Sequence, residues 1–281
     1  CTLLPSERAM SFFRGRSQPA QAAQLPTYTG LQLPTATSTL PIPLIWGRTK
    51  ASVNVIFQAG FTPVPELQAT QRGGKGGIGG IGGGGGGGGY QVVGWFYLAD
   101  LLLAIGEGPI QGVACVYKNR SVVDFATMGI TLFQGTDVQT NFSYIDTKYP
   151  GKGLAYRHTA YMGAPQYNLG ESAALGSVNF EILGRYYGSS FNSLDADPAL
   201  IIEDFLSNPT CGANFPVDEI SYDDLMGDTG DSSVQTYCTA MGIALSPNLN
   251  QFEPGNSVLE RWLGIMNTAS FISQGKLRMV P

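Results

Sequence analysis

Charged side chains are scarce in this sequence. Asp, Glu, Lys and Arg make up 13% of the 281 residues, which is about half of their share in an average soluble domain. Glycine is abundant instead, with 38 residues. This composition is typical of β-rich, loop-rich or assembly proteins rather than of a freely diffusing enzyme. The length leaves room for one large domain or two ordinary ones.

A stripe of basic residues is also missing, and the formal net charge is −5. Proteins that read a nucleic-acid sequence concentrate Lys and Arg on one surface. The sequence therefore disfavours that function, although it is compatible with lining a conduit through which DNA passes.

The usual ligands of zinc are nearly absent. His158 is the single histidine, and Cys1, Cys115, Cys211 and Cys238 form no C-x-x-C pair. A zinc site would need carboxylates or remote cysteines, so we expect no metal and no cofactor. Cys115 and Cys238 lie at apolar positions and are expected to be buried free thiols. Two disulfides also fit the count, but the spacing gives them no support.

No apolar run is long enough for a membrane helix, which needs about 20 residues. The most apolar stretch is residues 90–119, where Asp100 is the single charge between positions 92 and 106. Its Val, Trp, Phe and Tyr content favours a long strand. Glu107-Gly108-Pro109 then predicts a sharp corner, and residues 110–125 predict a hairpin.

A glycine-rich loop is expected over residues 72–89. Positions 73–89 hold 14 glycines, interrupted only by Lys75 and two isoleucines. Such a run cannot bury enough apolar area to offset its backbone entropy, so we expect a mobile loop that faces solvent or a lumen. Gly74-Lys75 matches the Gly-Lys pair of phosphate-binding loops. Those loops have Ser or Thr at the next position, where this chain has Gly76.

Residues 1–40 are predicted to form an extended N-terminal arm that needs a neighbour to order it, with a disordered tail as the alternative. The arm is followed by a hairpin-like pair of strands at 44–46 and 52–57, with a turn at 47–50. Residues 60–71 are expected to form a polar loop.

Further strands are predicted at 130–133, 142–145, 151–162 and 177–187. His158 is expected on a strand surface or an interface rather than as a catalytic base, because no cysteine lies in a nucleophile-type motif. Residues 41–190 are therefore predicted to be β-rich.

Residues 191–281 predict a small α+β domain with about three helices. Asp197 and Pro198 begin the first helix, and Gly242 ends the second, which spans 232–241. The third is expected to start at Ser257, with Glu260 completing a capping box. A hairpin about residues 274–275 follows. Acidic residues between 218 and 231 lack the spacing of a calcium loop.

Several stretches, taken in order, resemble the tail hub, or tail-tip, proteins of long-tailed bacteriophages, the lambda-type tip protein class, and the related hub of gene transfer agents. The matching segments are residues 41–48 (PIPLIWGR), the glycine-rich loop, 103–112 (LAIGEGPIQG), 195–198 (DADP), 237–247 and 275–277. The glycine run is purer than is usual in that family, and Gly106 stands where many relatives have cysteine. The family's chains are also longer, so we expect a piece of a longer protein.

The resemblance implies a β-barrel hub domain followed by the α+β domain, built as a homotrimer at the distal end of the tail in the virion. It implies no enzymatic activity. The implied partners are a ring of distal tail proteins, the tape-measure protein, tip and fibre proteins, phage DNA in transit, and the host surface. Trp46, Gly47, Glu107, Gly108 and Pro109 are the structural or interface candidates.

Two other functions stay open. A tail-associated cell-wall hydrolase needs paired carboxylates, but adjacent residues such as Asp223 and Asp224 do not face each other on a helix. An envelope-anchored lipoprotein would begin with a cysteine, as this chain does at Cys1, although the signal segment that precedes such a cysteine is not in the sequence.

Overall fold

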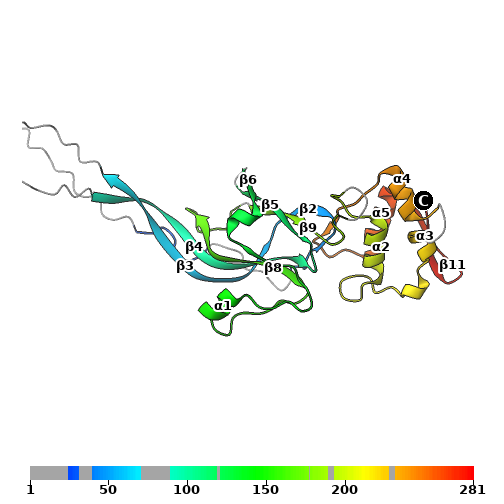
Figure 1. Ribbon diagram of the computed structural model, residues 1–281, viewed down its shortest axis with the longest axis horizontal. Coiled ribbons are helices and arrows are strands. Elements are labelled where there is room, and N and C mark those ends of the chain that lie inside the picture. The colour runs from blue at the N-terminus through cyan, green and yellow to red at the C-terminus, as the bar shows by residue number, and fades with distance from the viewer. Residues whose placement is uncertain are drawn as a thin grey trace, which may run out of the picture.

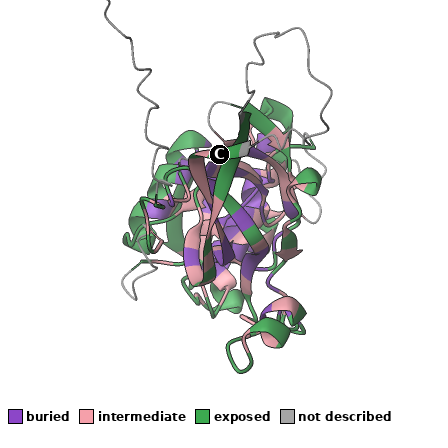
Figure 2. Ribbon diagram, turned by 90° about the vertical axis from the view of Figure 1, so that its left-hand side faces the viewer, coloured by how far each residue is buried: buried purple, intermediate pink, exposed green. Residues whose placement is uncertain are grey.

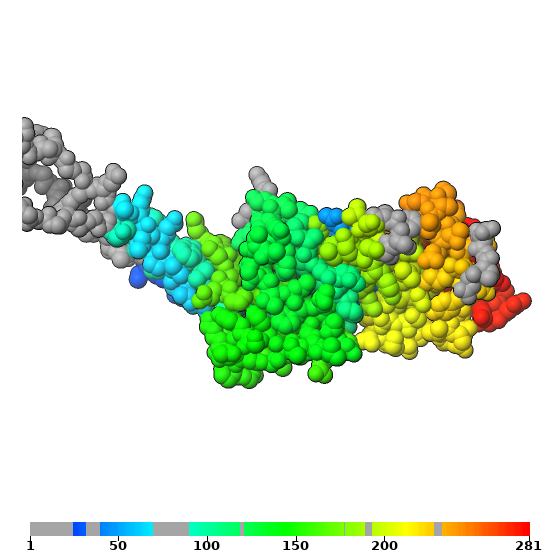
Figure 3. All heavy atoms as spheres, viewed as in Figure 1, coloured from blue at the N-terminus to red at the C-terminus, as the bar shows by residue number. Residues whose placement is uncertain are grey.

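The computed structural model describes residues 25–31, 40–70, 89–118, 121–176, 178–188, 193–227 and 232–281. These residues form an elongated molecule with two lobes (Figure 1). The β-rich lobe spans residues 40–188, and the α+β lobe spans 193–281. The lobes pack directly against each other, and a narrow ribbon projects from the β-rich lobe at the opposite end (Figure 3). The described residues are mainly β, with five α-helices.

The ribbon belongs to the longest strand pair of the molecule. Strands β3 (Asn54–Thr70) and β4 (Gly89–Glu107) are antiparallel, and their pairing continues to Thr70 opposite Gly89. The predicted strand and its end at Glu107 are confirmed. The residues that join β3 to β4, including 72–88 of the predicted glycine-rich loop, lie outside the described residues.

The polar loop predicted at 60–71 is wrong, because residues 60–70 form the second half of β3. Pro63 and Pro65 lie within that strand, and β3 is the edge strand of its sheet. Proline cannot donate a backbone hydrogen bond, so it is tolerated at a sheet edge. The proline and polar residues of this segment therefore led to the prediction of a loop where the chain forms an edge strand.

Two four-stranded sheets make the β-rich lobe, with strand orders β3-β4-β8-β7 and β2-β9-β5-β6. The other bounds are β2 (Arg48–Ala51), β5 (Gly112–Lys118), β6 (Ser121–Asp124), β7 (Thr131–Phe133), β8 (Thr159–Gly170) and β9 (Val178–Leu183). All neighbouring strands are antiparallel. The pairing of the described residues does not close a barrel, so the predicted barrel is not confirmed.

Both faces of the second half of β4 are covered, which explains the apolar residues at consecutive positions 101–103. Leu101 and Leu103 join a core cluster with Val116 of β5 and Phe180 of β9. Leu102 points to the other face and packs in a separate cluster with residues of the segment 142–161. Figure 2 shows the molecule end-on, with buried residues inside and exposed residues around them.

The hairpin predicted for 44–57 does not form. Strand β1 (Leu44–Ile45) pairs with β10 (Asn248–Leu249), about 200 residues away in the sequence. The predicted turn at 48–50 is strand β2, which pairs with β9. Gly47, at a φ of +61°, makes the corner between β1 and β2. That single residue turns the chain, so the following residues are free to extend.

The strand predicted at 142–145 is also wrong, because helix α1 (Ser143–Lys148) occupies this position. The strand predicted at 151–162 begins only at Thr159. Tyr156 and His158 have positive φ values of 45° and 65°, which are incompatible with an extended strand. The strand predicted at 130–133 is confirmed as β7.

The three predicted helices are present in the α+β lobe. They are α2 (Pro198–Ser207), α4 (Val234–Met241) and α5 (Gly255–Ile265), followed by the hairpin β11 (Ala269–Ser273) and β12 (Lys276–Val280). A fourth, short helix, α3 (Tyr222–Leu225), and two 3-10 turns, η1 (Phe125–Met128) and η2 (Val217–Glu219), were not predicted.

The helix ends show which sequence signals were used. The Asp197 carboxylate accepts a hydrogen bond of 2.9 Å from the backbone N–H of Ala199, and Gly242 ends α4 at a φ of +67°. The capping box predicted at Ser257 is wrong, since α5 begins at Gly255 after Pro254, with no side-chain cap.

Most of the predicted arm lies outside the described residues. Within residues 25–31, Tyr28 and Leu31 pack against the core of the β-rich lobe. The backbone N–H of Tyr28 donates a 3.2 Å hydrogen bond to the Tyr97 hydroxyl. This short stretch therefore docks on the chain itself.

Across the described part of the chain, no helix combines the length and the apolar character needed to cross a membrane.

Candidate functional site at the lobe junction

The two lobes meet at the lobe junction, defined as residues 43–48, 107–110, 184–185, 195–211 and 245–247. Its backbone is joined across large sequence distances. The N–H of Trp46 donates to the Pro247 carbonyl at 3.1 Å, and the N–H of Gly47 donates to the Arg185 carbonyl at 2.9 Å. The N–H of Arg185 in turn donates to the Ile45 carbonyl at 2.9 Å. Residues 45–47 are thus held between two remote segments.

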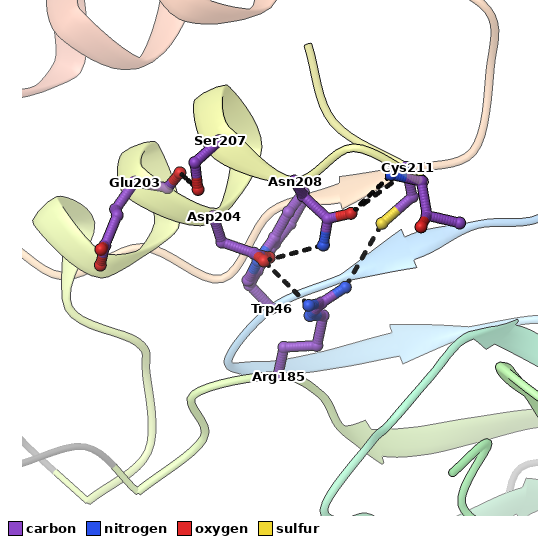
Figure 4. A network of polar contacts seen from close by, with 8 residues as sticks. Trp46, Arg185, Glu203, Asp204, Ser207, Asn208 and Cys211 are labelled. Carbon is purple, nitrogen blue, oxygen red and sulfur yellow. Dashed lines mark hydrogen bonds and ion pairs between the residues drawn. The ribbon is translucent and has the colours of Figure 1, made fainter. Parts of the chain in front are cut away.

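A buried polar network then joins the side chains of the two lobes (Figure 4). Asp204 of α2 is 6% exposed. Its carboxylate accepts hydrogen bonds of 2.8 Å from Trp46 Nε1 and 2.8 Å from Arg185 Nη2. Asn208 Nδ2 donates to the same carboxylate at 3.2 Å. Hydrogen bonds to an ionised group are stronger than neutral ones, so this network fixes the end of the β-rich lobe to α2.

Trp46 extends the junction into the hydrophobic core of the α+β lobe. Its side chain is 1% exposed, and its ring meets Trp262 edge-on at a centroid distance of 5.6 Å. Phe205 contacts the same Trp262 at 5.1 Å. A residue that follows β1 in sequence is therefore part of the core of the α+β lobe.

Cys211 lies at the rim of this network. Arg185 Nη1 donates a hydrogen bond of 3.4 Å to its sulfur, and burial raises the pKa of the thiol although Arg185 opposes that shift. A raised pKa keeps the sulfur protonated and unreactive at neutral pH.

Gly47 is sterically required at its corner. A Cβ at this position would collide with Ser246 Oγ and would lie 2.9 Å from the Ala196 nitrogen. Ser246 is fixed on both sides, because it accepts a hydrogen bond from the N–H of Arg48 at 3.0 Å and donates one to Asp195 at 2.6 Å.

Glu107, Gly108 and Pro109 form the corner between β4 and β5. The N–H of Glu107 donates to the Pro43 carbonyl at 2.8 Å, and the N–H of Gly108 donates to the His158 carbonyl at 2.7 Å. A Cβ at Gly108 would lie 2.6 Å from Gly135 Cα, so two backbone segments touch there. Pro109 itself is exposed.

The Glu107 side chain is half-buried at the lobe junction. Burial raises the pKa of its carboxyl group, while the neighbouring His158 and Arg185 side chains act in the opposite direction. Among the described residues, no group of three or more His, Cys, Asp or Glu side chains is placed to hold a metal ion.

The sequence prediction missed a second polar network, centred on Asp100 of β4. Its side chain is 1% exposed. It accepts hydrogen bonds from Lys148 (2.7 Å), from the hydroxyls of Tyr149 (2.6 Å) and Tyr144 (2.9 Å), and from the N–H of Gln166 (2.8 Å). Burial alone would raise the pKa of Asp100, but these hydrogen bonds outweigh burial and lower it. A lone charge within an apolar strand was the available signal.

One of the two carboxylates considered for a hydrolase, Asp224, is bound by an arginine. Asp224 accepts two hydrogen bonds from Arg278, of 2.7 and 2.9 Å. These bonds lower the pKa of Asp224, so it is ionised and bound to its partner. Asp223 is exposed beside it.

Comparison with models of protein families gives no match, and comparison with curated proteins gives none. One similar solved structure is a chain of the "Virion of native gene transfer agent (GTA) particle", with 16% sequence identity and a TM-score of 0.48. The alignment covers 93% of this chain and 57% of that chain. The present chain thus spans little more than half the length of the one it matches.

Proposed function

We propose that this chain is a structural component of a phage-like virion, namely the hub of the tail tip. There it would organise tail assembly, close the tail channel and position the parts that attach to the host. No catalytic residue is part of this proposal.

One observation carries the proposal. Segments that resemble tail hub proteins are far apart in the sequence, yet several of them meet at the lobe junction. Residues 43–48 form hydrogen bonds with Glu107 and with 246–247. Residues 245–246 in turn form hydrogen bonds with 195–196. Glycine corners and buried polar bonds fix the relative position of two lobes. That is the requirement of a scaffold rather than of a reaction.

The finer parts of the proposal follow from the resemblance. They are a homotrimer around the tail axis, a hub barrel, contacts with the distal tail ring and the tape-measure protein, attached tip and fibre proteins, and DNA that passes without binding. The low charge of the chain and its net charge of −5 are compatible with such a passage.

Imaging of particles tests the proposal. The chain would be tagged, expressed together with the genes of its particle, and located with tag-specific gold beads on purified particles. We expect label at the distal end of the tail and three-fold averaged density. A stable monomer in solution, with particles that carry no label, would contradict the proposal.

A peptidoglycan-release assay tests the hydrolase alternative. We expect no turnover above a buffer control from the purified chain. Release of soluble fragments that is lost in Glu107→Ala and kept in Glu171→Ala, an exposed position outside the lobe junction, would establish an enzyme instead.

A further inference from the structure

A groove of about 660 Å³ opens beside the lobe junction, within the size range of ligand and peptide pockets. Glu107 and three chain segments line it: residues 40–44, residues 205–213 and residues 249–258. Its apolar lining comprises Leu40, Pro41, Ile42, Leu44, Phe205, Leu249, Phe252 and Val258. The groove therefore has walls from both lobes.

Its rim exposes large apolar side chains to water. Phe252 is 84% exposed, Ile42 is 53% exposed and Leu40 is 50% exposed. Single exposed apolar residues are common on protein surfaces, but several around one groove mark an interaction site. A large apolar side chain that a partner covers completely can contribute much of the binding energy.

One negative charge faces this apolar groove. Glu107 belongs to its lining, and among the described residues its carboxylate has neither a hydrogen bond nor an ion pair. Glu253, the other acid of the lining, is bound to Arg261 by two hydrogen bonds of 2.7 and 2.9 Å. The two basic side chains that act on Glu107 are His158 and Arg185, and Arg185 is paired with Asp204. A half-buried carboxylate that forms no hydrogen bond and no ion pair with the described residues favours a cationic ligand, because partial desolvation strengthens their attraction.

We propose that this groove binds an extended segment of a partner protein in which apolar side chains flank one Lys or Arg. The basic side chain pairs with Glu107, and an apolar neighbour packs against Phe252 and Ile42. This inference concerns the chain alone and holds whether or not the chain is a tail hub.

A peptide selection tests this assignment. A random heptapeptide library displayed on filamentous phage would be selected on the purified full chain and counter-selected on the double variant Glu107→Gln, Phe252→Ser. We expect enrichment of peptides with one Lys or Arg between apolar residues. Enrichment without a basic residue, or none above the double variant, would overturn the proposal.

Fluorescence anisotropy with one enriched peptide then separates the two contacts. We expect Glu107→Gln to lower the affinity for the lysine-containing peptide about tenfold, which equals about 1.4 kcal/mol. For a peptide with norleucine in place of lysine, the same substitution should change the affinity less than about twofold. Phe252→Ser and Ile42→Ser should each lower the affinity for both peptides about fivefold, because each removes an apolar contact.

Val138→Ser is the matched control, since Val138 is 78% exposed and is not part of the groove lining. It should leave both affinities unchanged. Equal binding by the wild type and the rim variants would refute the site. Self-association that Phe252→Ser abolishes, with no peptide enriched, would assign the groove to a second copy of this chain and refute the partner segment.

Discussion

At the scale of single residues, a few buried polar side chains determine how the apolar strands are held. Asp100 interrupts the most apolar stretch of the sequence, yet it is buried and receives four donors. It fastens helix α1 and its flanking segment to β4 and β8. Gly60 faces the same carboxylate at a φ of +63°, where a Cβ would lie 2.7 Å from Asp100 Oδ2.

The substitution Asp100→Asn tests this network. The amide removes the negative charge and turns a donor toward the hydroxyls, so we expect the free energy of unfolding to fall by about 2 kcal/mol. Urea unfolding monitored by tryptophan fluorescence measures this loss. Asp137→Asn, at an exposed position of the neighbouring segment, should change stability by less than about 0.5 kcal/mol.

The contribution of Asp100 depends on pH with a definite sign. Its pKa in the folded chain is lowered from an ordinary value near 3.9. The stabilisation is therefore fully present above that ordinary value and disappears as pH falls through the lower, folded pKa. The stability difference between wild type and Asp100→Asn should shrink in urea titrations at successively more acidic pH. A difference that grows on acidification would disprove the assignment.

At the scale of elements, short-range signals explain the helices better than the strands. Asp197 caps α2 as its sequence position predicts, and it also accepts a hydrogen bond of 2.6 Å from Gln235 of α4. Strand partners depend instead on chain segments that are remote in sequence, as β1 and β10 illustrate. The same composition that suggests a loop forms an edge strand in β3.

Replacing the two predicted capping residues tests which of them caps a helix: Asp197 caps α2, whereas Ser257 caps none. Asp197→Ala should lower the free energy of unfolding by about 1.5 kcal/mol, because a buried cap is lost. Ser257→Ala should cost less than about 0.5 kcal/mol, because α5 starts at Gly255 without a side-chain cap. Thermal unfolding followed by circular dichroism compares the two. Equal losses would contradict the helix starts described here.

At the scale of the whole molecule, the lobe junction connects the hydrophobic core of the β-rich lobe to that of the α+β lobe. Trp46 enters the core of the α+β lobe, whereas Ile45, one residue before it, belongs to the core of the β-rich lobe. Asp204 and Arg185 add a buried ion pair with side-chain exposures of 6% and 14%. A change at this point should alter how the lobes are oriented and not only how stable each is.

Asp204→Ala tests the lobe junction. It leaves Arg185 and the Trp46 indole without their acceptor, so we expect a loss of about 3 kcal/mol in unfolding free energy. Asp204→Asn retains one acceptor oxygen and should lose less. Small-angle X-ray scattering should show a larger radius of gyration for Asp204→Ala if the lobes separate. Unchanged stability and scattering would show that the network does not join the lobes.

Glu107→Lys tests the proposed function at the same scale. A lysine at this position places a positive charge near Arg185, so we expect a folded chain that assembles poorly. If one contact weakens by about 1.4 kcal/mol, its equilibrium constant falls tenfold, and we expect particle yield to fall about tenfold. Electron microscopy counts the particles, with Glu171→Lys as the control. Normal tails from Glu107→Lys would contradict a structural role for this corner.

The sequence by itself determined the features whose causes are local. The β-branched and aromatic content of 90–107 specified β4, Glu107-Gly108-Pro109 ended it, and the cap at Asp197 and the glycine at 242 bounded helices. These signals act over a few residues, so one sequence suffices to detect them.

Only the tertiary structure decided which strands pair, what satisfies Asp100, and that Trp46 and Glu107 lie at one junction. The partners of these groups are 44 to about 200 residues away. Such contacts depend on the path of the whole chain and on which surfaces it buries together, and neither is encoded in a local pattern of residues.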